Sequence, residues 1–137
     1  MNLFADSSAL AKRYVADEKS DDFDKLLQRS TNLAVSVLCL PEIVSALCRR
    51  RRERSITPAQ YVAAKNALDG DLADAAIIQI TDQVLLESIL LLESNPLRAS
   101  DAIHISSAKA WHADAFVSAD ARQCAAAKAS GLEIIRL

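Results

Sequence analysis

Four acidic residues stand out because of where they fall relative to the predicted strands and helices. Asp6 is the last residue of an apolar run that predicts a buried strand. Glu42 and Asp101 lie in the first turns of predicted helices, and Asp120 comes two residues after a predicted strand. Ligands of open α/β sheets bind outside the carboxyl ends of the strands. We therefore expect the four carboxylates to meet at one edge of a sheet.

Carboxylates gathered in this way have a specific chemistry. Two unit charges about 4 Å apart repel by roughly 4 kcal/mol at an effective dielectric constant near 20. Protonation or a bound cation must offset that repulsion. Oxygen ligands without nearby His or Cys suit Mg²⁺ or Mn²⁺, and such ions serve phosphodiester hydrolysis. Each acid alone also has a simple structural role, because the helix dipole favours acids in a first turn by about 0.3–1 kcal/mol.

Hydrophobic periodicity places these acids in a single α/β domain, residues 1–137. The expected strands are 2–6, 33–36, 76–80, 115–118 and 132–135. The expected helices are 9–16, 23–29, 38–54, 57–72, 82–92, 100–112 and 121–130, with Ser7 or Ser8 capping the first and Leu40, Ile43, Val44 and Leu47 facing inward from the third. This alternation predicts a three-layer α-β-α architecture, with helices on both faces of a mostly parallel sheet of about five strands.

Composition limits the other possibilities. Half of the 137 residues are hydrophobic and only two are glycines, which argues against an all-β fold. The net charge of −2 provides no overall attraction to nucleic acid or membrane. The three cysteines lack metal-ligand spacing, so we expect free thiols in a cytoplasmic protein. No segment is long and apolar enough to predict a membrane span.

Four motifs in order resemble the PIN domain, and most closely the VapC-type toxins of bacterial and archaeal toxin–antitoxin pairs. They are Asp6-Ser7-Ser8, Pro41-Glu42-Ile43-Val44-Ser45-Ala46-Leu47, Leu97-Arg98-Ala99-Ser100-Asp101-Ala102-Ile103-His104 and Phe116-Val117-Ser118-Ala119-Asp120. The resemblance runs from the first predicted strand to the last and includes the chain length.

The resemblance implies a metal-dependent endoribonuclease that acts as the toxin of such a pair. Asp6, Glu42, Asp101 and Asp120 match the acidic quartet of the family and would be both the catalytic residues and the ligands of one or two Mg²⁺ or Mn²⁺ ions. A metal-activated water would attack the phosphorus in line and leave a 5′-phosphate and a 3′-hydroxyl. The implied partners are RNA, a cognate antitoxin and a second copy of the chain.

Several further residues near the acids have two interpretations. In the simpler interpretation Ser7 caps a helix and Ser118 ends a strand. In the other, their hydroxyls orient Asp6 or a metal-bound water by hydrogen bonds. His104 lies on the same helix face as Asp101, where a structural hydrogen-bonding role is the simpler interpretation. Arg49 and Arg50, in the one basic run, and Arg98 are either solvated side chains or contacts for RNA phosphates.

Two other functions remain compatible with the sequence. The chain is alternatively a catalytically inactive PIN-fold binding module that retains its acids. A Mg²⁺-binding receiver-like domain is disfavoured, because Asp6 has no acidic neighbour and the strand ending at Ile80 is followed by Thr81 rather than by a phosphoacceptor acid.

Overall fold

A computed structural model describes residues 1–15 and 19–137. Within these residues the strands form one five-stranded sheet, in the order β3-β2-β1-β4-β5, and every neighbouring pair is parallel. The strands are β1 (Asn2–Ala5), β2 (Asn32–Ser36), β3 (Ala76–Ile78), β4 (Ala115–Ser118) and β5 (Ile134–Arg136). The predicted α/β class, three-layer arrangement and parallel sheet are confirmed.

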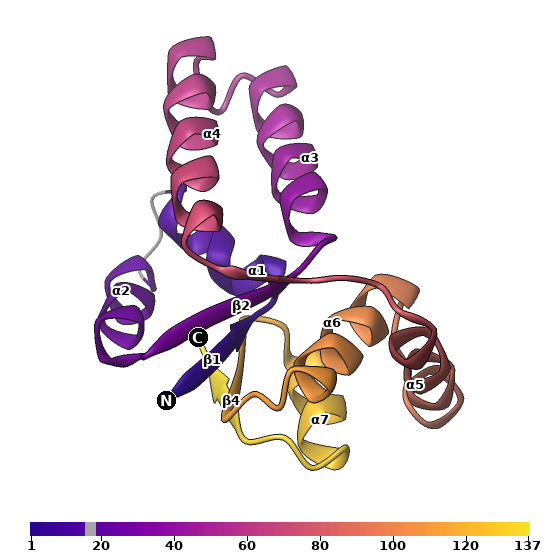
Figure 1. Ribbon diagram of the computed structural model, residues 1–137. Helices are drawn as coiled ribbons and strands as arrows, with labels where there is room; N and C mark the ends of the chain where they lie inside the picture. Colours follow the sequence, from indigo (N-terminus) through magenta and orange to yellow (C-terminus); the bar gives the residue numbers. More distant parts are fainter. Residues whose placement is uncertain (16–18) are drawn as a thin grey trace.

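Helices cover both faces of this sheet (Figure 1). One face packs against α1 (Ser7–Leu10), the 3₁₀ helix η1 (Ala11–Arg13), α2 (Ser20–Arg29), α3 (Cys39–Arg52) and α4 (Pro58–Ala73). The other packs against α5 (Asp82–Ser94), α6 (Ala99–Ala110) and α7 (Ala121–Ala129). In Figure 1, α3 and α4 form a hairpin that extends away from the sheet, while α5 lies outside α6.

Alternation along β1 explains why the core has two parts. Leu3 and Ala5 face one layer of helices, and Phe4 between them faces the other. Phe4 stacks on Phe116 of β4, with ring centroids 5.9 Å apart, and the two residues are register partners. This pairing fixes β1 beside β4, where the chain order across the sheet reverses. Such a reversal is the usual ligand site of an open α/β sheet.

Several predicted boundaries were wrong in detail. β1 ends at Ala5, and Asp6 itself caps α1 by accepting the backbone N–H of Ala9, so neither Ser7 nor Ser8 is the cap. The predicted helix 9–16 is instead α1 followed by η1, and its end at Ala16 lies outside the described residues. β3 stops at Ile78, and the last strand is 134–136 rather than 132–135.

The predicted inward stripe of α3 also needed one correction. Ile43 and Leu47 are buried and Val44 is half-buried, but Leu40 is 39% exposed, and Cys39 takes a buried position in its place. Cys39, Ile43 and Leu47 follow one another at four-residue intervals and so share the face of α3 that packs on the core, whereas Leu40 lies at the side of that face. None of the described helices has both the length and the apolar character needed to cross a membrane.

Candidate active site

Asp6 lies at the carboxyl end of the central strand and is completely buried. Its Oδ1 accepts hydrogen bonds from Ser8 Oγ at 2.7 Å and from the backbone N–H of Ala9 at 2.9 Å. Its Oδ2 accepts one from Ser118 Oγ at 2.5 Å. Burial raises the pKa of Asp6 above its ordinary value despite these three donors. A carboxylate held at a sheet edge at such a cost fits a site that binds a cation.

Asp120 is tied to Asp6 through Ser118, the last residue of β4. Ser118 Oγ donates to Asp6 and accepts the backbone N–H of Asp120 at 3.0 Å. Asp120 in turn caps α7, because its Oδ1 accepts the backbone N–H groups of Arg122 and Gln123 at 2.8 and 3.2 Å. No hydrogen bond within the described residues reaches Asp120 Oδ2, so this oxygen is available to a ligand.

Glu42 reaches the same edge from the first turn of α3. Its Oε1 accepts a hydrogen bond from Ser7 Oγ at 2.9 Å and is also paired with Nε2 of the buried His104 on α6. Partial burial works to raise the pKa of Glu42, but His104 and Ser7, with a further hydroxyl from Ser100, outweigh it and lower the pKa. Glu42 is therefore held as a carboxylate by groups from two other elements.

Asp101 occupies the first turn of α6, and both of its oxygens are engaged. Oδ2 accepts the backbone N–H of Arg98 at 3.1 Å, and Oδ1 accepts Nε2 of Gln123 at 3.0 Å. Gln123 also bonds Asp120 through its backbone, so it joins these two acids. Asp6, Asp120 and Asp101 are thus linked in this order through Ser118 and Gln123. Glu42 reaches the same edge by separate hydrogen bonds, to Ser7 beside Asp6 in the sequence and to His104 on the helix of Asp101.

The described residues do not present a finished metal cage. Within residues 1–15 and 19–137, no three His, Cys, Asp or Glu side chains are placed so that they could hold an ion together. The chemistry of the donors nevertheless fits Mg²⁺ or Mn²⁺, because all four candidate ligands are carboxylates on one edge. Metal ligation by Asp6, Glu42, Asp101 and Asp120 stays a prediction.

Two polar residues at this edge were underestimated or missed from the sequence. His104 was expected to be a structural hydrogen-bonding histidine on the face of Asp101, and the carboxylate that it bonds is that of Glu42. Gln123 gave no signal, because a glutamine in an alanine-rich helix reads as a surface residue. Its position became informative only when α7 was packed against α6.

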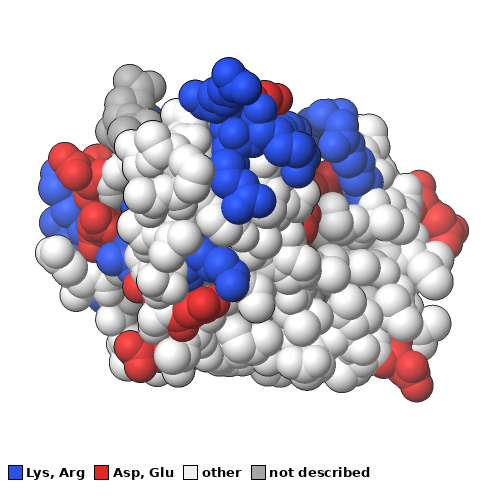
Figure 2. Space-filling model, turned by 90° about the horizontal axis from the view of Figure 1, so that it is seen from above, with Lys and Arg blue, Asp and Glu red and all other residues white. Residues whose placement is uncertain are grey.

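The candidate RNA-binding arginines lie at different distances from the acids. Arg49 is seven residues after Glu42, which places it about 10.5 Å further along α3. Arg50 lines a depression formed by α3, α4 and the end of η1, to which Arg13 and Tyr14 also contribute, and Arg98 precedes the first turn of α6, where Asp101 lies. Seen from above, a large group of basic side chains and a smaller one to its right have acidic side chains between them (Figure 2).

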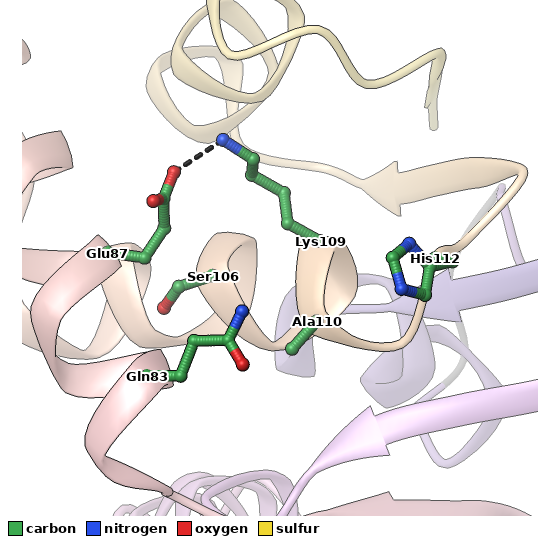
Figure 3. Close-up of a pocket in the computed structure, with 6 residues that line it drawn as sticks. All are labelled: Gln83, Glu87, Ser106, Lys109, Ala110 and His112. Atoms are coloured by element: carbon green, nitrogen blue, oxygen red, sulfur yellow. Dashed lines mark hydrogen bonds and ion pairs between the residues drawn. The ribbon is translucent and has the colours of Figure 1, made fainter.

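A separate pocket of about 220 Å³ lies between α5 and α6 (Figure 3). Gln83 and Glu87 reach it from α5, and Lys109 from α6 forms an ion pair with Glu87. Ser106, Ala110 and His112 complete its lining. None of the four acids lines this pocket, so it is distinct from the acidic edge.

Comparison with known proteins identifies the family. The family model described as "PIN domain" matches residues 3–129. The chain belongs to the PIN domain family. The resemblance predicted from four short motifs is therefore confirmed, and it extends over nearly the whole chain. A search of curated protein sequences found no significant match to this PIN domain.

Solved structures resemble this PIN domain in fold at low sequence identity. VapC20 of Mycobacterium tuberculosis, described as a sarcin–ricin loop cleaving toxin, is 17% identical with a TM-score of 0.73, over 98% of this chain and 99% of that one. VapBC2 of Rickettsia felis, bound to a promoter DNA fragment, is 15% identical with a TM-score of 0.71, over 100% and 99%. A toxin–antitoxin complex of Klebsiella pneumoniae is 17% identical with a TM-score of 0.69, over 91% of each chain.

Proposed function

We propose that this PIN domain is a Mg²⁺- or Mn²⁺-dependent endoribonuclease, acting in the cytoplasm as the toxin of a toxin–antitoxin pair. The observation that carries the proposal is the hydrogen-bonded edge where β1 meets β4. It links Asp6, Asp120 and Asp101 through Ser118 and Gln123, and Glu42 adjoins it through Ser7 and His104. Structural neighbours that include VapC toxins and toxin–antitoxin complexes support it.

The protein residues divide the work at this edge. Asp6, Glu42, Asp101 and Asp120 would hold one or two cations, and Ser7, Ser118 and His104 fix the orientation of two of these carboxylates. When bound, the cation supplies charge for a phosphate oxygen and activates the water that cleaves the phosphodiester bond. Asp6 needs the cation most, because its charge is completely buried.

RNA reaches this edge, in our proposal, along the arginines of α3 and beside Arg98. Arg49 and Arg50 are exposed and lie on the same helix as Glu42, so a strand of phosphates that contacts them leads toward the acids. The four carboxylates at this edge repel RNA unless a cation is present. The basic residues therefore supply the attraction that the net charge of −2 does not.

A nuclease assay on the purified protein tests the proposal. RNA should be cleaved with Mg²⁺ or Mn²⁺ and left intact with EDTA, and Asp6→Asn should abolish cleavage. Cleavage that persists in EDTA, or in Asp6→Asn at the wild-type rate, would refute the catalytic assignment. RNA binding without cleavage under every condition would instead identify an inactive binding module.

We also propose two protein partners, a cognate antitoxin and a second copy of the chain. The exposed apolar side chains concentrate on α5, where Leu86 is 66% and Leu90 60% exposed with Ile89 between them. A monomer rarely leaves such a contiguous apolar face in water. A two-fold pair of α5 helices would bury it on both copies, because a symmetric interface uses the same patch twice.

The antitoxin is tested by co-expression with the product of the adjacent reading frame. Co-purification of the two proteins, with loss of RNA cleavage in the complex, is the expected result. A neighbouring product that neither binds the PIN domain nor inhibits it would contradict the assignment to such a pair.

A further inference from the structure

Gln123 is a polar residue at a buried position, and packing alone does not explain why a glutamine stands there. It lies in the first turn of α7 and is only 5% exposed. Its backbone N–H donates to Asp120 Oδ1 at 3.2 Å, and its side-chain Nε2 donates to Asp101 Oδ1 at 3.0 Å. One residue therefore contacts two of the four candidate metal ligands, from α7 and α6.

The other end of the same carboxamide is unsatisfied. Among the described residues, Gln123 Oε1 is buried and has no hydrogen-bond partner. The assignment of oxygen and nitrogen follows from chemistry, because an ionised carboxylate only accepts and the atom facing Asp101 must be the donor. A buried amide oxygen without a partner destabilises a fold. An apolar side chain of equal length would fill the same space without that cost.

We propose that Gln123 is a positioning residue of the metal site, one that fixes the Asp101 carboxylate relative to Asp120. The inference rests on the proposed metal-dependent function. The side chain holds Asp101 Oδ1 from one side while the backbone of Arg98 holds Oδ2 from the other. Asp101 is thereby kept in one orientation before any ion arrives, and groups that orient ligands in this way raise metal affinity.

The neutrality of Gln123 is part of the proposed role. A carboxylate at this position would face Asp101 across the same short distance, with like charges and no donor between them. The metal-free protein would lose stability, whereas a bound cation would gain another negative neighbour. A glutamine orients Asp101 without adding to the repulsion.

Calorimetric titration with Mn²⁺ tests this role without relying on activity. Gln123→Met keeps the length of the side chain and removes both polar atoms. We expect a melting temperature equal to or above that of the wild type, together with about tenfold or greater loss of Mn²⁺ affinity. Lys128→Met, exposed further along α7, is the matched control and should leave both quantities unchanged.

A second variant covers the case in which Gln123→Met does not fold. Gln123→Glu should melt below the wild type without metal, and Mn²⁺ should raise its melting temperature by more than it raises that of the wild type. Equal Mn²⁺ responses in Gln123→Glu and wild type, or unchanged affinity in a folded Gln123→Met, would overturn the positioning role while leaving the nuclease proposal intact. A wild-type protein that binds no Mn²⁺ at millimolar concentration would overturn both.

Discussion

Ser118 Oγ donates a 2.5 Å hydrogen bond to Asp6 Oδ2, joining the ends of β1 and β4 across 112 residues of sequence. The same hydroxyl accepts the backbone N–H of Asp120 at 3.0 Å. One buried serine thus positions two of the candidate metal ligands at the reversal point of the sheet. Ser118 therefore both ends β4 and orients the Asp6 carboxylate.

Replacing Ser118 by Ala should therefore lower both stability and cleavage. The change leaves Asp6 Oδ2 unpaired in a buried place and the backbone N–H of Asp120 unpaired in a partly buried one, which costs about 1–3 kcal/mol of unfolding free energy. Urea unfolding measures this loss. Ser94→Ala is the control, since its exposed hydroxyl donates to Leu90 O within α5, and it should change stability by less than about 0.5 kcal/mol. Equal effects of the two substitutions would contradict the assignment.

The metal-free protein should show opposite pH dependences for Asp6 and Glu42. The pKa of Asp6 is raised on folding, so its contribution to stability is present below its ordinary pKa of 3.8 and is lost as pH rises through the folded pKa. Asp6→Asn should thus gain stability relative to wild type with rising pH. The pKa of Glu42 is lowered, so its contribution is present above 4.5 and is lost as pH falls through the folded pKa.

Urea unfolding in EDTA between about pH 3 and 7 measures both effects. Glu42→Gln should lose stability relative to wild type as pH rises, whereas Asp6→Asn gains it. In the presence of Mn²⁺ both variants should lose RNA cleavage by more than about 100-fold, since several kcal/mol of charge stabilisation depend on the ion. Parallel pH dependences of the two variants would contradict the burial argument.

Removing His104 should release Glu42 from its fixed orientation. His104 is 1% exposed, and its Nε2 is paired with Glu42 Oε1. His104→Ala should cost about 1–3 kcal/mol of unfolding free energy, because it empties a buried position and leaves Glu42, whose side chain is 36% exposed, with hydroxyl donors only. His104→Gln retains a donor and should recover part of the stability and of the cleavage. A double-mutant cycle with Glu42→Gln measures the coupling, and additive effects would show that the contact has no energetic importance.

Neutralising the α3 arginines should change the salt dependence of RNA binding. Each phosphate contact that is lost reduces the log–log salt slope by about one. Arg49→Ala and Arg50→Ala should each flatten the slope, as measured by fluorescence anisotropy at several salt concentrations. Arg29→Ala, at the end of α2, is the control. Arg51 should matter less, because its guanidinium stacks on Tyr61 at 4.3 Å. An unchanged slope in Arg49→Ala and Arg50→Ala would exclude this run from RNA binding.

A charge on the apolar face of α5 should dissociate the proposed dimer. Leu86→Glu combined with Leu90→Glu places like charges at the centre of a symmetric interface, where they repel and lose apolar contact. Light scattering after size exclusion should then report a monomer. Val62→Glu, at an exposed apolar position on α4, is the control and should leave the dimer intact. A wild-type monomer at micromolar concentration would contradict the dimer.

Most secondary structure followed from local signals. Thr57 caps α4 through a capping box with Gln60, in agreement with the predicted helix 57–72, and Thr81 caps α5 directly before the predicted start at residue 82. The errors lie at the ends of helices and strands, where local hydrogen-bonding groups decide the boundary. Asp6 caps α1 because the chain turns directly after β1, and no periodicity separates that from a cap at Ser7. Leu40 was placed inward because spacings of three and of four residues both suit a helical stripe, and the buried stripe follows the four-residue spacing of Cys39, Ile43 and Leu47.

The sequence alone determined the alternation of strands and helices, the two-sided core along β1 and the four acids at carboxyl ends and first turns, because these depend on short-range periodicity and capping. The tertiary structure decided which residues link those acids. Ser118 meets Asp6, His104 meets Glu42 and Gln123 meets Asp101 only because parallel strands bring three helix starts to one edge. Contacts across 22 to 112 residues depend on how layers pack, and no local pattern encodes that packing.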